Sequence, residues 1–317
     1  MRSRRISRRA FLTCTATLAA TGLVGLPERS WRKAWAAPGN TTVSQTIIGT
    51  GGQYQRLAFG PGEPYLLRED LGTAAQADRT LRRIPLLYFA QLSDTHVLDA
   101  QSPARVEYLD TLKIDGSLPF ASAFRPQEMQ TPFVLDSMVR QLNTLKTSAL
   151  SGLPLAFAIN TGDTTDNQQL NELRWLIEIL DGGDVSLASG SATYEGVQRG
   201  NTLPSYYHPD DPSVDDYGRL HAFPAYPGLV DASESSLTAA GLAVPWYAVF
   251  GNHDGLVQGT VPALDAFERL ATGPIKIIAF PFGPEQGARF ARDLLRGDPT
   301  SWRQLYKWVE TRPNGVA

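Results

Sequence analysis

Cysteine occurs only once in the 317 residues, as Cys14, so no disulfide can form within the chain. Histidine is almost as scarce, and any imidazole ligand in a metal site must come from His96, His208, His221 or His253. A long hydrophobic run is also missing, because the mildly apolar residues 11–26 are diluted by Thr and Gly and fall short of the roughly 20 residues that span a bilayer. The composition, 42% hydrophobic and 19% charged, is that of a globular protein with a full core.

Residues 1–36 have the pattern of an export signal rather than that of a folded segment. Met1–Arg9 carries five arginines and no acid, an apolar stretch follows, and small residues lie around Ala34–Ala36. Within this segment, Ser7–Leu12 (SRRAFL) resembles a twin-arginine (Tat) signal, which implies the Tat translocase as a partner during export and a secreted or cell-envelope location. The alternative is a membrane anchor, but the short apolar stretch argues against it, so we expect no stable anchor.

Positive charge is scarce in the rest of the chain. Residues 1–36 hold eight Lys or Arg and one acid, which leaves 21 basic and 31 acidic residues and a net charge of −10. Such a chain is poorly suited to binding the phosphate backbone of nucleic acids, so we expect no bulk nucleic-acid binding. Any phosphate that the protein handles must be bound locally, most easily by metal ions.

Apolar runs of strand length alternate along the chain with segments whose apolar residues recur at helical spacing. Residues 37–83 are expected to form an N-terminal extension with a hairpin around residues 49–60, and residues 84–317 to form a domain. That domain contains three apolar runs of strand length (IPLLYFAQL, LPLAFAIN and VPWYAVF), which are typical of strands covered on both faces. Two helical patterns lie between them, carrying Leu135, Met138, Val139, Leu142 and Leu145 in the first and Leu170, Leu173, Ile177 and Leu180 in the second. The order β-α-β-α predicts a layered α/β core, interrupted by a loop-rich insertion at about residues 181–241.

Polar residues follow each of the three apolar runs. The three segments are Asp94–Thr95–His96, Gly162–Asp163–Thr164–Thr165–Asp166 and Gly251–Asn252–His253–Asp254. Any one of them alone is more often a solvated turn than a site. Together they supply carboxylate, imidazole and amide oxygen at the carboxyl ends of strands, where layered α/β folds bind their ligands. This ligand set is suited to divalent metals.

In these three segments the sequence resembles the calcineurin-like metallophosphoesterase superfamily, whose signature runs Asp-x-His, Gly-Asp-x-x-Asp and Gly-Asn-His-Asp/Glu. The resemblance covers roughly residues 84–256 and, with the Tat-like signal, is closest to exported bacterial metallophosphoesterases. It implies a layered α-β-β-α core, two metal ions (Mn, Fe or Zn) and hydrolysis of a small phosphate mono- or diester.

The resemblance also implies a role for each matching residue. Asp94 and His96 would bind the first metal, Asp163 would bridge both metals, and Asn252 would bind the second through its side-chain oxygen. His253 would be the catalytic acid at the leaving oxygen, oriented by Asp254 or Asp94. Gly162 and Gly251 would keep side-chain bulk away from the metals.

The signature of the family continues with a further His and a Gly-His-x-His block, and this chain has no histidine after His253. We therefore expect a domain that is incomplete at its C-terminus. The alternative function is then an inactive remnant that retains half a metal site. His208 and His221 precede the third segment and are interpreted as loop residues rather than replacement ligands.

Overall fold

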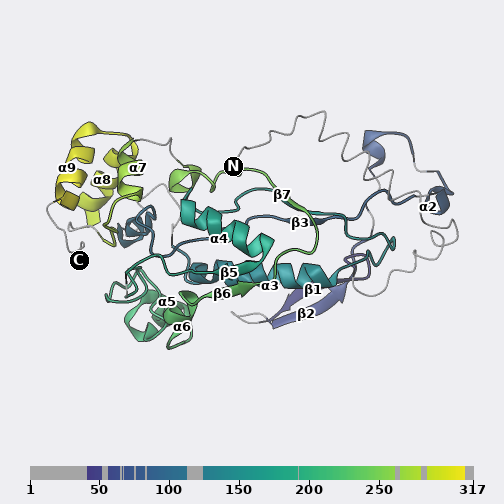
Figure 1. Cartoon of the computed structure of the whole chain (residues 1–317), viewed down its shortest axis with the longest axis horizontal. Helices are drawn as coiled ribbons and strands as arrows, with labels where there is room; N and C mark the ends of the chain where they lie inside the picture. The colour runs from purple at the N-terminus through teal and green to yellow at the C-terminus, as the bar shows by residue number, and fades with distance from the viewer. Residues whose placement is uncertain are drawn as a thin grey trace. The chain divides into compact units, whose positions relative to one another are not determined.

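The computed structural model describes residues 41–51, 56–64, 66, 68–74, 76–82, 84–112, 124–191, 193–260, 265–279 and 284–310 (Figure 1). The expected export signal, residues 1–36, lies outside the described residues. Contacts divide the chain into two compact units, one made of Met1–Ala90 with Thr144–Phe157 and the other of Gln91–Asn143 with Ala158–Ala317. All candidate site residues belong to the second unit.

The first unit contains the predicted hairpin. Strand β1 (Gln45–Thr50) pairs antiparallel with β2 (Arg56–Pro61), with Gln45 opposite Pro61 and Thr50 opposite Arg56. A 3-10 turn (η1, Glu69–Leu71) and the short helix α2 (Arg79–Arg82) follow.

The second unit is built on a three-stranded sheet in the order β3-β4-β7. The strands are β3 (Ala90–Leu92), β4 (Ala158–Asn160) and β7 (Trp246–Ala248), and β4 pairs with β7 in parallel. Helix α3 (Thr131–Thr144) connects β3 to β4, and α4 (Leu170–Asp181) follows β4. The predicted β-α-β-α order and the general α/β class are therefore confirmed.

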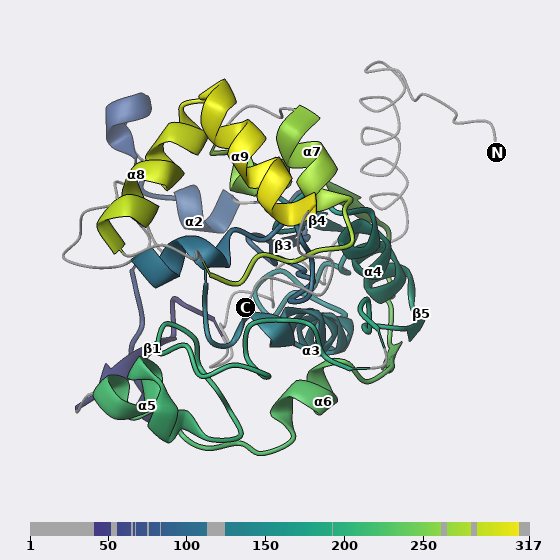
Figure 2. The same cartoon turned by 90° about the vertical axis from the view of Figure 1, so that its left-hand side faces the viewer.

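One hydrophobic core joins this sheet to both helices, which Figure 2 shows beside the strands. In the first helical pattern the predicted core residues Leu135 and Val139 are buried and Leu142 is partly buried. The prediction is wrong there for Met138 and Leu145, which are exposed. On α4 the prediction is wrong for three residues, because Leu170, Leu173 and Ile177 are exposed. The buried face of α4 consists instead of Glu172, Trp175, Leu176, Ile179 and Leu180. The helix carries apolar residues on more than one face, and periodicity alone did not identify the face that packs.

The opposite face of the sheet is open in the described part of the chain. Alternate residues of β3 are buried and exposed, and Val249 and Phe250, which follow β7, are 50% and 76% exposed. The expectation that the apolar runs are covered on both faces is therefore wrong for these residues. The described residues include no second sheet of the kind an α-β-β-α core requires.

The predicted insertion is more ordered than its sequence indicates. Strand β5 (Gly183–Val185) pairs antiparallel with β6 (Leu237–Ala239), and between them lie η4 (Pro212–Val214), α5 (Asp216–His221) and α6 (Leu229–Ser233). A second apolar cluster anchors this region: its buried members are Phe124, Val197, Tyr206 and Tyr207. Tyr207, Tyr217 and Phe223 of the insertion pack against one another, whereas Tyr226 is exposed.

Short turns and a group of helices complete the second unit. The turns are η2 (Glu107–Leu112), η3 (Glu128–Gln130) and η5 (Leu256–Gly259). Helices α7 (Asp265–Ala271), α8 (Pro284–Leu295) and α9 (Pro299–Glu310) lie together in both views (Figures 1 and 2). Within the described ranges, no helix combines the length and apolarity needed to cross a membrane.

Candidate metal centre

The three polar segments meet at one edge of the sheet, where main-chain hydrogen bonds connect them. The amide of Asp94 donates to the carbonyl of Gly162 (3.1 Å), and that of His96 donates to the carbonyl of Asp163 (3.0 Å). The amide of His253 donates to the Asp163 carboxylate (2.8 Å). Asp163 thus lies between the other two segments, as a bridging ligand must.

Two glycines allow this close approach. A Cβ atom on Gly251 would lie 2.3 Å from both the amide nitrogen and a carboxylate oxygen of Asp163. Gly162 has a φ of +118°, and its Cβ would lie 3.1 Å from the Cα of Gly251. Any side chain at Gly251 would push the second and third segments apart, which agrees with the predicted need for small residues here.

Asp94, His96 and Asp163 form a compact ligand set. Each offers one ligand atom, and these atoms all lie within 4.8 Å of one another. All three backbones are left-handed, with φ values of 56°, 42° and 49°. Such conformations are costly for residues other than glycine and tend to occur at functional sites. The structure therefore brings together three of the four predicted metal ligands.

Asp166 organises the two histidines of the site, a role that the sequence analysis did not assign. Its Oδ1 atom lies 2.9 Å from Nδ1 of His96 and 3.0 Å from Nδ1 of His253. The two rings meet edge to face, with centroids 4.5 Å apart. Because an ionised carboxylate only accepts hydrogen bonds, each Nδ1 must carry the proton, and each Nε2 is left as the free nitrogen.

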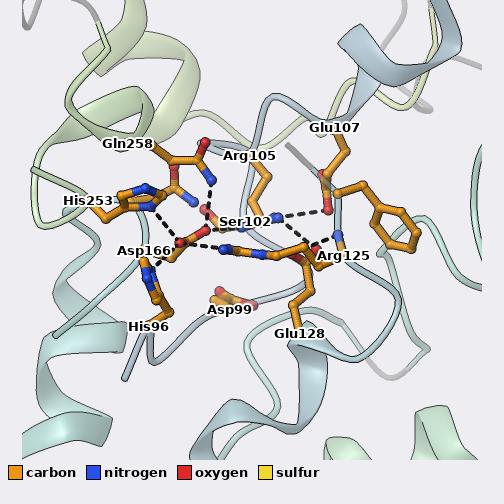
Figure 3. A network of polar contacts seen from close by, with 12 residues as sticks. His96, Asp99, Ser102, Arg105, Glu107, Arg125, Glu128, Asp166, His253 and Gln258 are labelled. Carbon is orange, nitrogen blue, oxygen red and sulfur yellow. Dashed lines mark hydrogen bonds and ion pairs between the residues drawn. The ribbon is translucent and has the colours of Figure 1, made fainter. Parts of the chain in front are cut away.

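Arginines approach Asp166 from the side opposite the histidines (Figure 3). Arg105 donates to its Oδ2 (2.6 Å), and Arg125 donates to its Oδ1 (2.8 Å). Burial alone would raise the pKa of Asp166, but hydrogen bonds from His253 and His96 and the charges of both arginines hold it well below its ordinary value. Asp166 is therefore an anion whose charge is already neutralised.

This neutralisation distinguishes between two possible cation sites. His96, Asp166 and His253 also offer ligand atoms within 4.8 Å of one another. A cation placed there would face the guanidinium groups that bind Asp166, whereas the nearest charged partner of Nε2 of His96 is Asp94 Oδ1, 3.8 Å away. The cation site is therefore better formed by Asp94, His96 and Asp163, with Asp166 supporting His96 from behind.

A buried ionic cluster surrounds Arg105. Arg105 is 1% exposed and also binds Glu107 (3.0 Å) and Glu128 (2.7 Å). Lys276 binds the far oxygen of Glu107 (2.6 Å). Together the cluster contains three cations and three carboxylates: Arg105, Arg125, Lys276, Glu107, Glu128 and Asp166.

The remaining predicted residues, Asn252 and Asp254, have different surroundings. The side chain of Asn252 is exposed, and its Nδ2 donates to the carbonyl of Gln258 (3.4 Å). The Asp254 carboxylate is buried and accepts hydrogen bonds from Thr164, Thr165 and the amide of Gly251. The expectation that Asp254 or Asp94 orients His253 is corrected, because Asp166 does so. Asp254 instead ties the second segment to the third.

The other two histidines lie in the insertion, as expected. His208 is buried, with Nδ1 3.3 Å from the carbonyl of Gln198 and Nε2 3.1 Å from that of Leu203. Both of its ring nitrogens therefore face main-chain oxygens. His221 ends α5 and is exposed.

Glu172 gives the second unit a testable pH dependence. Burial raises its pKa to about 8, while a hydrogen bond from the Asp99 amide opposes that shift. Between about pH 4.5 and pH 8, the unfolded chain has therefore released a proton that the folded chain retains, so stability falls as pH rises through this window. Urea unfolding at several pH values should show this decline in the free energy of unfolding. In Glu172→Gln the free energy of unfolding should fall by about 1.4 kcal/mol less per pH unit than in the wild type. Parallel profiles for the two proteins would contradict the raised pKa.

The chain matches no family model, no curated protein and no solved structure.

Proposed function

We propose that this protein is an exported, metal-dependent phosphoesterase that hydrolyses a phosphate mono- or diester. The observation that carries the proposal is the convergence of Asp94, His96 and Asp163, all in left-handed backbone conformations, from two neighbouring strand ends. Two independent features support it. His253 lies beside this set, and the Tat-like signal precedes the domain.

The residues present fit one divalent cation well. Asp94, His96 and Asp163 would hold it, since two carboxylates and a neutral imidazole nitrogen suit Mn, Fe or Zn. A second cation would be held by Asp163 and Asn252. A bound divalent cation supplies positive charge that polarises a phosphoryl oxygen and makes water more acidic.

His253 is the residue best placed to move a proton. It is partly exposed, and its Nδ1 proton is held by Asp166, so Nε2 is the atom that would exchange a proton with the leaving oxygen. By accepting the Nδ1 proton, the Asp166 carboxylate would hold the His253 ring in the tautomer and orientation that this transfer needs. Arg105 and Arg125 in turn keep Asp166 ionised and fixed in position.

Hydrolysis of an aryl phosphate and of an aryl phosphodiester tests the proposal. Purified residues 37–317 are expected to show Mn²⁺-dependent turnover that chelation removes. Asp163→Asn replaces the carboxylate that both cations would share with an uncharged amide. It should raise the activation barrier by several kcal/mol, which lowers turnover on the order of hundreds-fold or more.

Asp184→Asn is the matched control. Asp184 lies on β5 and accepts a hydrogen bond from Thr238, away from the three polar segments. Its variant should retain wild-type turnover. Turnover that survives chelation, or that is equal in Asp163→Asn and the wild type, would refute the proposed function.

A further inference from the structure

The turn that follows the third polar segment is strained. Within η5, Val257 and Gln258 have φ values of 52° and 55°. Two consecutive residues other than glycine rarely adopt this conformation, and Val257 is β-branched, which makes it less favourable still. Val257 is buried, so surrounding contacts hold the turn in this shape.

Gln258 contacts the candidate site in two directions. Its side-chain Nε2 donates to Oδ2 of Asp166 (3.1 Å), as Figure 3 shows. Its main-chain carbonyl accepts a hydrogen bond from Nδ2 of Asn252 (3.4 Å). The turn also packs closely on Asn252, because a Cβ atom on Gly259 would lie 2.2 Å from the Asn252 carbonyl oxygen.

The hydrogen bond that Asn252 donates to Gln258 determines which atom of the Asn252 side-chain amide is available as a ligand. Since Nδ2 donates to Gln258, Oδ1 is the end left available as a ligand, and no hydrogen bond to Oδ1 is present among the described residues. On the other side of Gln258, the Asp166 carboxylate holds His96 and His253 through its Oδ1 atom. Gln258 thus links the side-chain amide of Asn252 to Asp166, and through Asp166 to the two histidines.

We infer that Gln258 is a positioning residue that couples the amide of Asn252 to Asp166 and its two histidines. The side-chain bond to Asp166 anchors the strained turn, and the anchored turn holds the amide with its oxygen outward. The inference rests on the proposed function in one respect, which is that Asn252 is a cation ligand.

Mn²⁺ titration by calorimetry tests this coupling without measuring hydrolysis. Gln258→Gly removes the side-chain bond but keeps a left-handed backbone favourable. It is expected to weaken Mn²⁺ binding roughly 10-fold, the low end for partners of metal ligands. In an Asn252→Ala background the same substitution should cause no further loss, because the residue through which it acts is gone.

The matched control is Gln127→Ala, at an exposed position beside η3. Equal Mn²⁺ affinity in Gln258→Gly and the wild type would overturn the inference, as would losses that simply add in the double variant. If Gln258→Gly fails to fold by circular dichroism, Gln258→Asn replaces it, since asparagine tolerates the left-handed conformation but is one methylene shorter.

A second readout uses the metal-free protein. The side-chain amide signal of Asn252 in NMR spectra should shift in Gln258→Gly and stay unchanged in Gln127→Ala. An unchanged signal in Gln258→Gly would overturn the inference even if the wild-type chain bound no Mn²⁺. The absence of Mn²⁺ binding by the wild type would contradict the proposed function instead.

Discussion

Asp166→Asn is expected to impair both the candidate metal site and the fold. The substitution keeps the shape of the side chain but removes the negative charge. That charge lies on the carboxylate that accepts hydrogen bonds from Nδ1 of His96 and of His253. Partners behind metal ligands typically contribute 10- to 100-fold to metal affinity or activity, so Mn²⁺ binding and turnover should both fall by roughly that factor. Calorimetry and steady-state kinetics on the same samples measure the two effects.

The stability cost of Asp166→Asn has the same origin. Asp166 is fully buried, and without it three cations would face two carboxylates. Removing one partner of a buried ion pair lowers the free energy of unfolding by about 3–5 kcal/mol, which urea unfolding would show.

Asp136→Asn is the control. Asp136 is also buried and ion-paired, but its partners, Arg140 and the amide of Ala240, lie outside the site. It should lose stability without losing Mn²⁺ affinity. Equal losses of Mn²⁺ affinity in the two variants would indicate that Asp166 has no special role.

Arg105→Met is expected to be the most destabilising single change. Arg105 contacts Glu107, Glu128 and Asp166 with almost no exposure, so its loss leaves three buried carboxylates with fewer cations. We expect a loss of at least about 3–5 kcal/mol in the free energy of unfolding. At roughly 2–4 °C per kcal/mol, the range for domains of about 150–250 residues, the melting temperature should fall by roughly 6–20 °C.

The effect of Arg105→Met should also grow with pH. Burial raises the pKa of Glu128 to about 7, against the lowering effect of Arg105. Without Arg105 that pKa rises further, so the variant retains a proton on Glu128 that the unfolded chain has lost. A group with a raised carboxyl pKa loses stability as pH rises, so the deficit should be larger at pH 8.5 than at pH 6.

Arg140→Met provides the comparison for Arg105→Met. Arg140 also pairs with an aspartate, Asp136 (2.6 Å), but its side chain is largely exposed. Exposed pairs contribute about 0–1 kcal/mol, so this variant should unfold close to the wild type. A similar small effect at Arg105 would show that the buried cluster contributes little.

The sequence was sufficient to predict helices α3 and α4 and the positions of the polar segments. Thr131 opens α3 as expected, and the runs ending at Asp94, Asp163 and Asn252 do meet at one edge of the sheet. These features depend on local pattern: helical periodicity, apolar runs, and glycines where two backbones approach closely. Each can be read from a window of roughly 11–18 residues.

The ion pairs and hydrogen bonds that hold the candidate metal ligands in place could not be predicted in this way. Arg105 and Asp166 are 61 residues apart, and Arg105 follows a segment with no distinctive pattern. Only the folded chain shows that a buried guanidinium reaches Asp166. The role of Asp254 was mistaken for a related reason, since sequence proximity to His253 does not decide which carboxylate reaches its ring. The packed face of α4 likewise depends on tertiary contacts, because Leu173 and Leu176 are equally apolar.

The central claim is that a cation binds at Asp94, His96 and Asp163 rather than at the neighbouring set that includes His253. Pulsed EPR of the Mn²⁺-loaded protein tests it directly, because a coordinated imidazole nitrogen modulates the electron spin echo. We predict a modulation from one imidazole that His96→Ala removes and that both His253→Ala and the control His208→Ala retain. A modulation that persists in His96→Ala, or that His253→Ala abolishes, would contradict this account.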